Sequence, residues 1–582
     1  MDNRGISRIL REIADLLEIK NENPFKIRAY RNGADIAANH PHHLESLDEA
    51  GLREIPGIGK DLAARIREIA ETGASSFHKE LVSEFAPTIL DLLRLQGVGP
   101  KTVATLYREL GIRTLDDLER AAADGRVRSL RGMGTKKEAL IVKALEERRR
   151  FEGRHLLPAS SDTAAAVVAY LKTRIPDAQI EPVGSLRRGC ETCGDLDLLA
   201  SGAPLEIMDA FVHYDAVERV LGQGATKSSV LLSGGFQADL RLVSADSRGA
   251  ALQYFTGSKP HNIALRDRAM GLGLKLNEYG LFRISDDSKV AGLTEEEIYE
   301  GLGLEWIPPE LREMRGEIAA AANRSLPRLV ERADLRGDLH MHTTESDGKD
   351  DLRTMALAAR AQGHEYIAIT EHSQSLAMAN GLDERRAAAH AARIRALDAE
   401  GHGIRILAGI ECDIKADGSL DLSDDCLASL DVVVASIHSA FTQDRRQMTE
   451  RVLKAIDNPH VDILGHPTGR AILRREPIDV DMATVVDAAR EHGVAMEINC
   501  QAHRLDLNDV NARLARDRGV SLVISTDAHS HRALESLRFG VLVARRAWAG
   551  PQDVLNTRSF EEFRNLLRRN ARRARVAAKK KR

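Results

Sequence analysis

The chain has 582 residues, 29% of them charged and 43% hydrophobic, a composition typical of soluble globular proteins. Its length predicts about four domains, and no apolar run approaches the roughly 18 residues of a membrane-spanning helix. The net charge of −4 does not by itself indicate a nucleic-acid partner. The charged N-terminal segment lacks a signal-peptide core, and five cysteines, an odd number, argue against a disulfide framework. We therefore expect a cytoplasmic protein.

Residues 1 to about 150 have the pattern of successive helices interrupted by three glycine-rich turns. One Gly-x-Gly turn also closes ordinary helix pairs, whereas three in tandem favour helix-hairpin-helix units. In such a unit the backbone amides at the start of the next helix, with a lysine beside them, can hold a DNA phosphate whatever the base sequence. The residues expected to contact DNA are Gly57, Gly59, Lys60, Gly97, Gly99, Lys101, Gly132, Gly134 and Lys136.

Strand and helix patterns alternate from about residue 158 to 316, and three aspartates stand out there. Asp195 and Asp197 are two residues apart on a predicted strand, so both side chains point to one face, and Asp239 on another apolar run can join them. Three convergent carboxylates suit two Mg²⁺ ions, which clamp the attacking and leaving oxygens of a phosphoryl transfer. An acidic strand end on the surface is the alternative, but the preceding Gly184-Ser185 turn favours a triphosphate site, because it adds backbone, hydroxyl and guanidinium donors.

These motifs resemble the X family of DNA polymerases, nucleotidyltransferases that fill short repair gaps, and the resemblance covers residues 1–316. It implies that Asp195, Asp197 and Asp239 are catalytic and bind Mg²⁺ or Mn²⁺, with Asp239 activating the primer 3′-hydroxyl. It implies DNA contact by Arg266. The residues that it places on the incoming nucleotide are Gly184, Ser185, Arg188, Gly194, Tyr254, Phe255, Gly257 and Asn262.

One position departs from the family pattern. Some members remove 5′-deoxyribose phosphate through a Schiff-base lysine in the helix after the first hairpin, and the matching position here is Arg65. A guanidinium stays protonated and cannot serve as that amine, and neither Lys26 nor Lys60 takes the matching place. We therefore do not expect a native lyase activity.

From about residue 335 to 575, short apolar runs each end in a histidine, aspartate, glutamate or asparagine. A parallel α/β barrel places its reactive groups at the C-terminal ends of its strands, on one face. We therefore expect several divalent metals there and metal-assisted hydrolysis of a phosphate ester. The expected ligands are His340, His342, Asp347, His372, Glu411, His438, His466, Asp527 and His529. Asn499 also ends an apolar run but is not assigned.

This ligand series resembles the polymerase-and-histidinol-phosphatase (PHP) domain. The resemblance implies a three-metal centre in which Glu411 bridges two of the ions. His340, His342, Glu411 and Asp527 would hold the first ion, Glu411, His438 and His466 the second, and Asp347, His372 and His529 the third. A mixed nitrogen and oxygen ligand set suits Mn²⁺ or Zn²⁺, and the sequence does not choose between them.

The expected fold class is therefore multidomain α/β. The expected parts are helical DNA-binding regions at 1–85 and 86–157, a nucleotidyltransferase palm at 158–245, a nascent-base-pair-binding region at 246–316, a helical linker at 317–334, a distorted (β/α)7 TIM-like PHP barrel at 335–575 and a basic tail at 576–582. For the tail, a solvated segment and a weak contact to phosphates remain open.

The two halves together resemble bacterial family X polymerases with an appended PHP domain. The resemblance implies a monomeric DNA repair enzyme that uses dNTPs on gapped or primed DNA, and a Mn²⁺-dependent 3′→5′ exonuclease in the barrel. Abasic-site endonuclease and 3′-phosphatase activities are further expectations for the same centre. Two alternatives stay open: a barrel that acts on a small phosphate monoester, and a non-catalytic DNA-binding scaffold.

Overall fold

The computed structural model describes residues 3–39, 44–85, 89–93, 95, 98–130, 132–151 and 153–567. Gly97 and the basic tail therefore lie outside the described residues. The chain divides into two compact units, Met1–Glu152 and Gly153–Arg582. Among the described helices, none combines the length and the apolar character that crossing a membrane requires.

The first unit is helical, as predicted. Apolar faces of its helices pack into one buried cluster that extends from Ile6 to Leu145. Its helices are α1 (Asn3–Ile19), α2 (Pro24–Asn39), α3 (Glu49–Glu54), α4 (Lys60–Thr72), α5 (Ser76–Ser83), α6 (Ile89–Leu93), α7 (Pro100–Leu110), α8 (Leu115–Ala123) and α9 (Gly134–Phe151). Helices α4 and α7 both end at a glycine in the left-handed conformation, which permits a sharp turn after the last helical carbonyls.

The second unit begins with a palm-like sheet of five strands in the order β2-β4-β7-β6-β5. Its strands are β2 (Gln179–Pro182), β4 (Asp195–Ser201), β5 (Val217–Gln223), β6 (Lys227–Leu232) and β7 (Gln237–Val243), and β4 and β7 run parallel. Helices α10 (Leu157–Arg174) and α12 (Glu206–Val212) pack on Leu196 and Leu198 of β4. Because side chains alternate along a strand, Asp195 and Asp197 face away from these helices.

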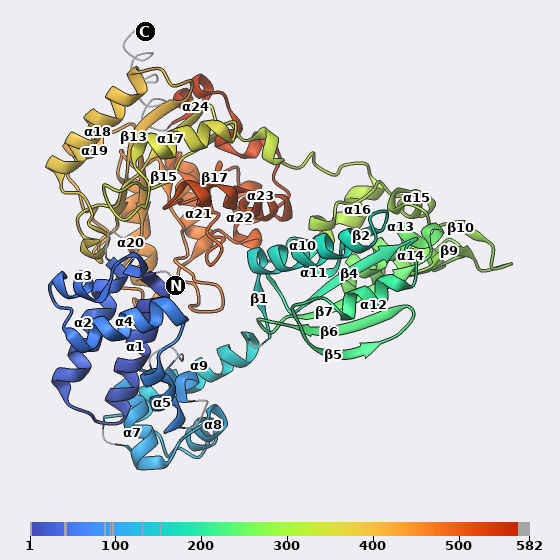
Figure 1. Ribbon diagram of the computed structural model, residues 1–582. Helices are drawn as coiled ribbons and strands as arrows, with labels where there is room; N and C mark the ends of the chain where they lie inside the picture. Colours follow the sequence, from blue (N-terminus) through green and yellow to red (C-terminus); the bar gives the residue numbers. More distant parts are fainter. Residues whose placement is uncertain are drawn as a thin grey trace, which may run out of the picture. The chain divides into compact units, whose positions relative to one another are not determined.

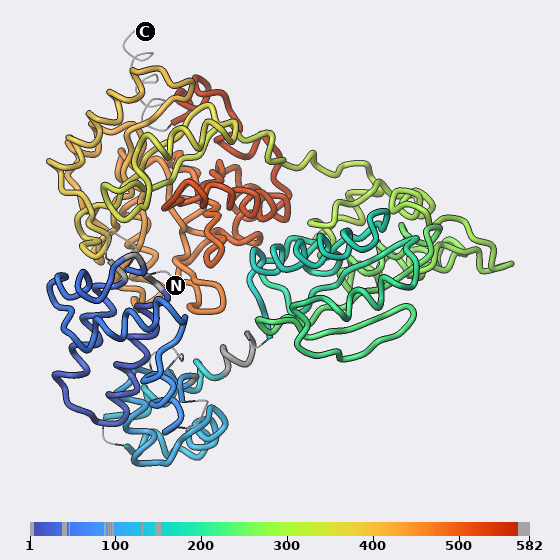
Figure 2. Tube along the Cα trace, viewed as in Figure 1, coloured from blue at the N-terminus to red at the C-terminus, as the bar shows by residue number. Residues whose placement is uncertain are grey.

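A small helical and β region follows the palm. It contains α13 (Arg248–Thr256), α14 (Lys259–Gly271), β8 (Leu274–Asn277), β9 (Gly280–Arg283), β10 (Lys289–Ala291) and α15 (Glu295–Gly301). The next segment was expected to be a helical linker. The short helix α16 (Glu317–Ala322) and a 3-10 turn at Arg332–Asp334 form there, and Figure 2 shows the chain continuing without a long helix towards the barrel. Pro327, which cannot continue a helix, lies shortly after α16.

The rest of the unit is a nearly closed parallel barrel, which confirms the TIM-like fold (Figure 1). Its seven strands lie side by side in sequence order: β11 (Gly337–Asp338), β12 (Tyr366–Ile369), β13 (Arg405–Asp413), β14 (Val432–Ser436), β15 (Ile463–Leu464), β16 (Ala495–Asn499) and β17 (Leu522–Ser525). A parallel bridge between Met341 and Ala528 joins the first and last strands just beyond their ends. The helices between and after them are α17 (Leu352–Ala361), α18 (Glu384–Ala399), α19 (Asp424–Ser429), α20 (Arg445–Asp457), α21 (Met482–His492), α22 (Asp509–Asp517) and α23 (Leu537–Arg546).

Side chains alternate between the inside of the barrel and its helical layer. On β12, Tyr366 and Ala368 belong to the interior cluster, whereas Ile367 and Ile369 belong to the cluster shared with the helices. Helix α24 (Phe560–Leu566) contributes Phe563 to the interior cluster, stacked on Tyr366 at a centroid distance of 4.9 Å. Tyr366 starts its strand, so α24 covers the N-terminal ends of the strands, and the C-terminal ends remain for a functional site.

Candidate active sites

Three aspartates of the palm sheet lie together, as expected from their spacing. Asp197 on β4 is the register partner of Asp239 on β7. Lys227 on β6 pairs with Asp239, with 2.6 Å between Nζ and Oδ2. Burial and the charges of Asp195 and Asp239 raise the pKa of Asp197 to about 6. Such repulsion between carboxylates fits a divalent cation, whose charge would favour their ionised forms.

The glycine turn approaches these carboxylates closely. Gly184 begins the short helix α11 (Gly184–Arg187), and a Cβ atom on it would lie 2.6 Å from Oδ2 of Asp197. Its φ of +64° also favours glycine. Beside the turn is a cavity of about 640 Å³. Its lining includes all the predicted nucleotide-contacting residues, Gly184, Ser185, Arg188, Gly194, Tyr254, Phe255, Gly257 and Asn262, together with Asp195, Asp197 and Arg266.

Hydrogen bonds fix the orientation of one predicted nucleotide contact. Asn262 donates through Nδ2 to the Tyr254 carbonyl at 2.7 Å and accepts from Gln253 at 2.8 Å. The same cavity is lined by Arg154 and Lys259, two cationic residues that are not among those predicted to contact the nucleotide. The position of Lys259 at the start of a helix, directly after Gly257-Ser258, was an available signal. Arg154 belongs to no motif.

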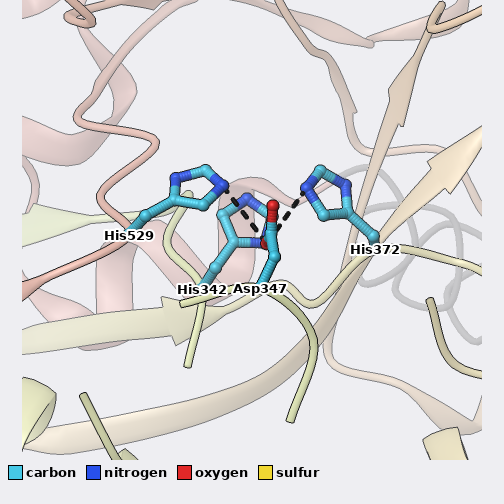
Figure 3. Close-up of side chains that lie close together, drawn as sticks. All are labelled: His342, Asp347, His372 and His529. Atoms are coloured by element: carbon cyan, nitrogen blue, oxygen red, sulfur yellow. Dashed lines mark ion pairs between the residues drawn. The ribbon is translucent and has the colours of Figure 1, made fainter. Parts of the chain in front are cut away.

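The barrel brings the nine predicted ligands to the C-terminal ends of its strands. The ligand atoms of eight of them gather in three overlapping groups: His342, Asp347, His372 and His529; His340, His342 and Asp527; and His372, Glu411 and His438. The ninth, His466, lies beside Glu411. Figure 3 shows the first group, in which Oδ1 of Asp347 lies 3.3 Å from His529 Nε2 and 3.5 Å from His372 Nε2. Because His342 and His372 each belong to two groups, the division of ligands among three ions stays a prediction.

Glu411 is central to this arrangement, because both of its oxygens face histidine nitrogens. The facing atoms are His466 Nε2 at 2.9 Å, His438 Nε2 at 3.3 Å and His340 Nε2 at 3.5 Å from Oε1, and His372 Nδ1 at 2.7 Å and His342 Nε2 at 3.8 Å from Oε2. A carboxylate can bridge two ions, whereas one imidazole nitrogen binds one. The position of Glu411 therefore supports a bridging role.

The chemistry of the site fits divalent metal ions. Nε2 of His340, both ring nitrogens of His342 and Oε2 of Glu411 are buried and make no hydrogen bond to the described part of the chain. Buried polar atoms need partners, and imidazole and carboxylate together are ligands of divalent transition metals. Burial and the neighbouring rings of His372 and His529 lower the pKa of His342 to about 4, which keeps it in its neutral, ligating form.

A second layer of polar side chains, which no sequence motif indicates, orients the ligands. Asp413 lies 2.9 Å from Nδ1 of His438, and Asn499 donates to Oδ2 of Asp527 at 3.0 Å. Partners of this kind hold a ring in the orientation and tautomer that metal binding requires. Asn499 ends its strand beside Asp527 and donates to this ligand, which explains its place in the series.

The hairpins of the first unit have the expected geometry where they are described. Gly59 and Gly99 are the N-caps of α4 and α7, and Gly134 begins α9. Gly57 and Gly132 have φ of +94° and +83°, values that glycine adopts without strain. Lys60, Lys101 and Lys136 are exposed in the first turns of these helices. That lysines and helix N-termini here contact DNA stays a prediction.

Arg65 lies on α4 in a polar setting. It donates to Glu68 at 3.2 Å, and both Arg65 and Lys26 stack over the ring of Phe77. Burial would lower the pKa of Arg65, but the hydrogen bond to Glu68 and nearby charges raise it above its usual value. The guanidinium therefore stays protonated and cannot serve as the amine of a Schiff base.

Known proteins share these parts. The profile of the Helix-hairpin-helix domain matches residues 1–75, that of the SAM-like Helix-hairpin-helix tandem residues 89–147, that of the DNA polymerase beta thumb residues 251–313 and that of the PHP domain residues 338–501. The match to the polymerase thumb corresponds to the small helical and β region after the palm.

The similar proteins are of two kinds: one covers nearly the whole chain, and the others cover about two fifths of it. The chain is 38% identical over 573 residues to the DNA polymerase/3′-5′ exonuclease PolX of Bacillus subtilis (strain 168). The aligned region covers 98% of this chain and 100% of that protein. It is 30% identical over 241 residues to a probable phosphatase of Thermoanaerobacter sp. (strain X514), with 38% of this chain and 89% of that protein covered. A probable phosphatase of Shewanella sp. (strain MR-4) is also 30% identical, over 40% of this chain and 90% of its own length.

Proposed function

Because the chain belongs to the family of the DNA polymerase/3′-5′ exonuclease PolX, we propose that it extends a DNA primer with dNTPs and removes nucleotides from the 3′ end at a second centre. The observation that carries this proposal is the presence of two separate ligand sets, three palm carboxylates and nine barrel side chains. DNA and dNTPs are the partners. We further propose that the protein works as a cytoplasmic monomer in repair of short gaps.

In the palm, Asp195, Asp197 and Asp239 would hold Mg²⁺ or Mn²⁺, which supplies charge stabilisation for phosphoryl transfer. The adjacent strands β4 and β7 fix the spacing of these carboxylates. Asp239 accepts the proton of the primer 3′-hydroxyl. Ser185 and Arg188, on the turn beside the carboxylates, donate to the triphosphate, and Tyr254 and Phe255 border the sugar.

In the barrel, the nine predicted ligands would hold up to three Mn²⁺ or Zn²⁺ ions. Bound there, such ions lower the pKa of a water towards neutrality and offset the charge of a phosphodiester. The chain's own contribution is to hold these ligands in a fixed orientation. Asp413 on His438 serves this purpose. Abasic-site endonuclease and 3′-phosphatase activities need the same chemistry and are proposed for the same centre.

Two double variants test the separation of the activities. Asp195→Ala with Asp197→Ala removes two palm carboxylates, and we expect loss of nucleotide incorporation with exonuclease activity retained. His340→Ala with His342→Ala removes two barrel ligands, and the opposite outcome is expected. Both are compared on one gapped substrate. If either double variant loses both activities while its thermal midpoint is unchanged, the assignment of one activity to each site is wrong.

A second candidate function of the barrel has one observation in its favour. The probable phosphatases cover only 38% and 40% of this chain, about the share that the barrel takes up, and 89% and 90% of their own lengths. Turnover of a 3′-recessed duplex compared with turnover of histidinol phosphate discriminates between the candidates. Faster turnover of the small monoester would favour a barrel phosphatase fused to a polymerase.

A further inference from the structure

One carboxylate joins the palm turn to the barrel. Oε1 of Glu313 accepts hydrogen bonds from Nε of Arg188 at 3.0 Å and from Nη1 of Arg546 at 2.9 Å. Arg188 directly follows α11 in the palm, and Arg546 is the last residue of α23 in the barrel. Arg546 also donates to the backbone carbonyl of Arg188 at 2.8 Å. Arg546 therefore binds both Glu313, which is the side-chain partner of Arg188, and the backbone of Arg188 itself.

The guanidinium of Arg546 is fixed from its other edge as well. Asp509, at the start of α22, accepts from Nε and Nη2 of Arg546 at 3.1 and 2.9 Å. The Arg546 side chain is only 9% exposed, so these bonds are shielded from solvent. A planar guanidinium that is bound on both edges has one orientation, unlike a flexible ammonium. Arg546 is therefore a rigid link between the barrel and the turn.

From Arg188 the link continues into the nucleotide cavity. Nη1 of Arg188 donates to the carbonyl of Thr256 at 2.5 Å, between Phe255 and Gly257, which both line that cavity. Helix α23 also touches the turn directly, because a Cβ atom on Gly189 would lie 3.2 Å from Cβ of Leu542. The turn, the Phe255–Gly257 segment and the barrel helix are thus held against one another.

We propose that Arg546 is a positioning residue for the polymerase, and that through Glu313 it keeps Arg188 in the geometry that binds the triphosphate of a dNTP. The inference rests on the proposed function, in which Arg188 contacts the triphosphate. Without Arg546, Glu313 keeps Arg188 as its cationic partner. The backbone carbonyl of Arg188 also loses the hydrogen bond that Arg546 donates to it. Arg188 is then drawn towards Glu313, and its remaining donors no longer point in a fixed direction towards the phosphates.

The test is single-nucleotide incorporation by the full-length Arg546→Gln variant on a primed template, with kcat and KM for the dNTP measured separately. We expect KM to rise roughly tenfold, a factor that corresponds to about 1.4 kcal/mol, while kcat changes much less. Arg546→Lys keeps a charge between Glu313 and Asp509 but has a single nitrogen, so its KM should lie between those of the wild type and Arg546→Gln.

Arg538→Gln is the matched control. Arg538 lies on the same helix α23 and pairs with Asp162 of the palm helix α10 at 3.1 Å, but both side chains are more than half exposed and neither lines the nucleotide cavity. Its KM should equal that of the wild type, and exonuclease activity should be unchanged in both variants. An equal rise of KM in Arg538→Gln would overturn the proposal, because loosening of the interface in general would then explain the effect.

A second variant keeps the test decisive if Arg546→Gln does not fold. Glu313→Gln removes the central carboxylate and should raise KM by a similar factor, and the double variant should be no worse than either single variant. Additive effects, or an unchanged KM in the folded variants, overturn the inference. If the wild type itself incorporates no nucleotide, the proposed function fails instead, so the two failures are distinguishable.

Discussion

Glu497 lies 2.7 Å from Nδ1 of His340, and its other oxygen accepts the backbone N–H of His466 at 2.6 Å. One buried carboxylate on β16 therefore orients two predicted metal ligands that are 126 residues apart in the sequence (466 − 340). Because the carboxylate holds the proton on Nδ1, Nε2 of His340 is left free to bind a metal.

Replacing Glu497 with glutamine tests this role. Glu497→Gln preserves the shape but removes the charge that holds the His340 ring, so we expect a loss of roughly 10- to 100-fold in metal affinity and exonuclease rate. Nucleotide incorporation should not change. Metal titration of the chelated protein measures the first quantity. Glu450→Gln, an exposed glutamate of α20 that pairs with Arg446, is the control and should have no effect. Unchanged metal affinity in Glu497→Gln would contradict the prediction.

Glu295 makes the second unit sensitive to acid. Burial would raise its pKa, but the charges of Arg312 and Arg187 outweigh burial and lower the pKa to about 2. A depressed acid contributes stability above its unfolded pKa of about 4.5, amounting to roughly 3 kcal/mol, and loses it as pH falls from about 4.5 towards 2. Glu295→Gln should therefore have a lower thermal midpoint at pH 7, and the difference from wild type should shrink across this window.

The control for this prediction is Glu296→Gln, an exposed neighbour on the same helix α15. Its midpoint should follow that of the wild type at every pH. A constant difference between Glu295→Gln and the wild type from pH 7 to pH 3 would show that the ion pairs with Arg187 and Arg312 do not shift the titration of Glu295.

Helix α24 contributes to the stability of the barrel. Phe563 is fully buried against Tyr366, whereas Leu566 on the same helix is 55% exposed. Phe563→Ala should destabilise by about 3–5 kcal/mol, since it removes buried contacts and leaves a cavity, and Leu566→Ala should cost less than about 0.5 kcal/mol. Thermal midpoints of the two variants measure the difference. Equal midpoints would mean that α24 does not contribute to the folded barrel.

The three hairpin lysines should contribute to DNA affinity but not to sequence preference. Replacing Lys60, Lys101 and Lys136 together with alanine should weaken binding to all duplexes alike. It should also reduce the slope of log affinity against log salt by roughly one for each DNA phosphate that a lysine no longer neutralises. Lys79→Ala, at an exposed position on α5, serves as the control. Fluorescence anisotropy at several salt concentrations checks the prediction. If the triple variant kept the wild-type salt dependence of DNA affinity, these lysines would not contact DNA phosphates.

Much of the protein could be predicted from local pattern. Paired aspartates two residues apart must share a strand face, glycine turns before helices predict hairpins, and apolar runs that end in histidine or carboxylate predict a barrel with ligands at one end. The structure brings together the predicted palm residues around one cavity and the predicted barrel ligands around Glu411. These predictions succeeded because they depend on the strand period and on a fixed property of parallel barrels.

Other features depend on contacts between distant segments, which no local pattern records. Glu497 and Asp413 were not recognised, because a carboxylate behind a ligand looks in the sequence like any strand residue. Arg546 belongs to no motif, and only the packing of α23 against the palm turn places it beside Arg188. The sequence by itself determined which chemical groups the two sites contain. The tertiary structure alone decided which neighbours orient those groups, because burial and hydrogen bonding between distant segments exist only once the chain is folded.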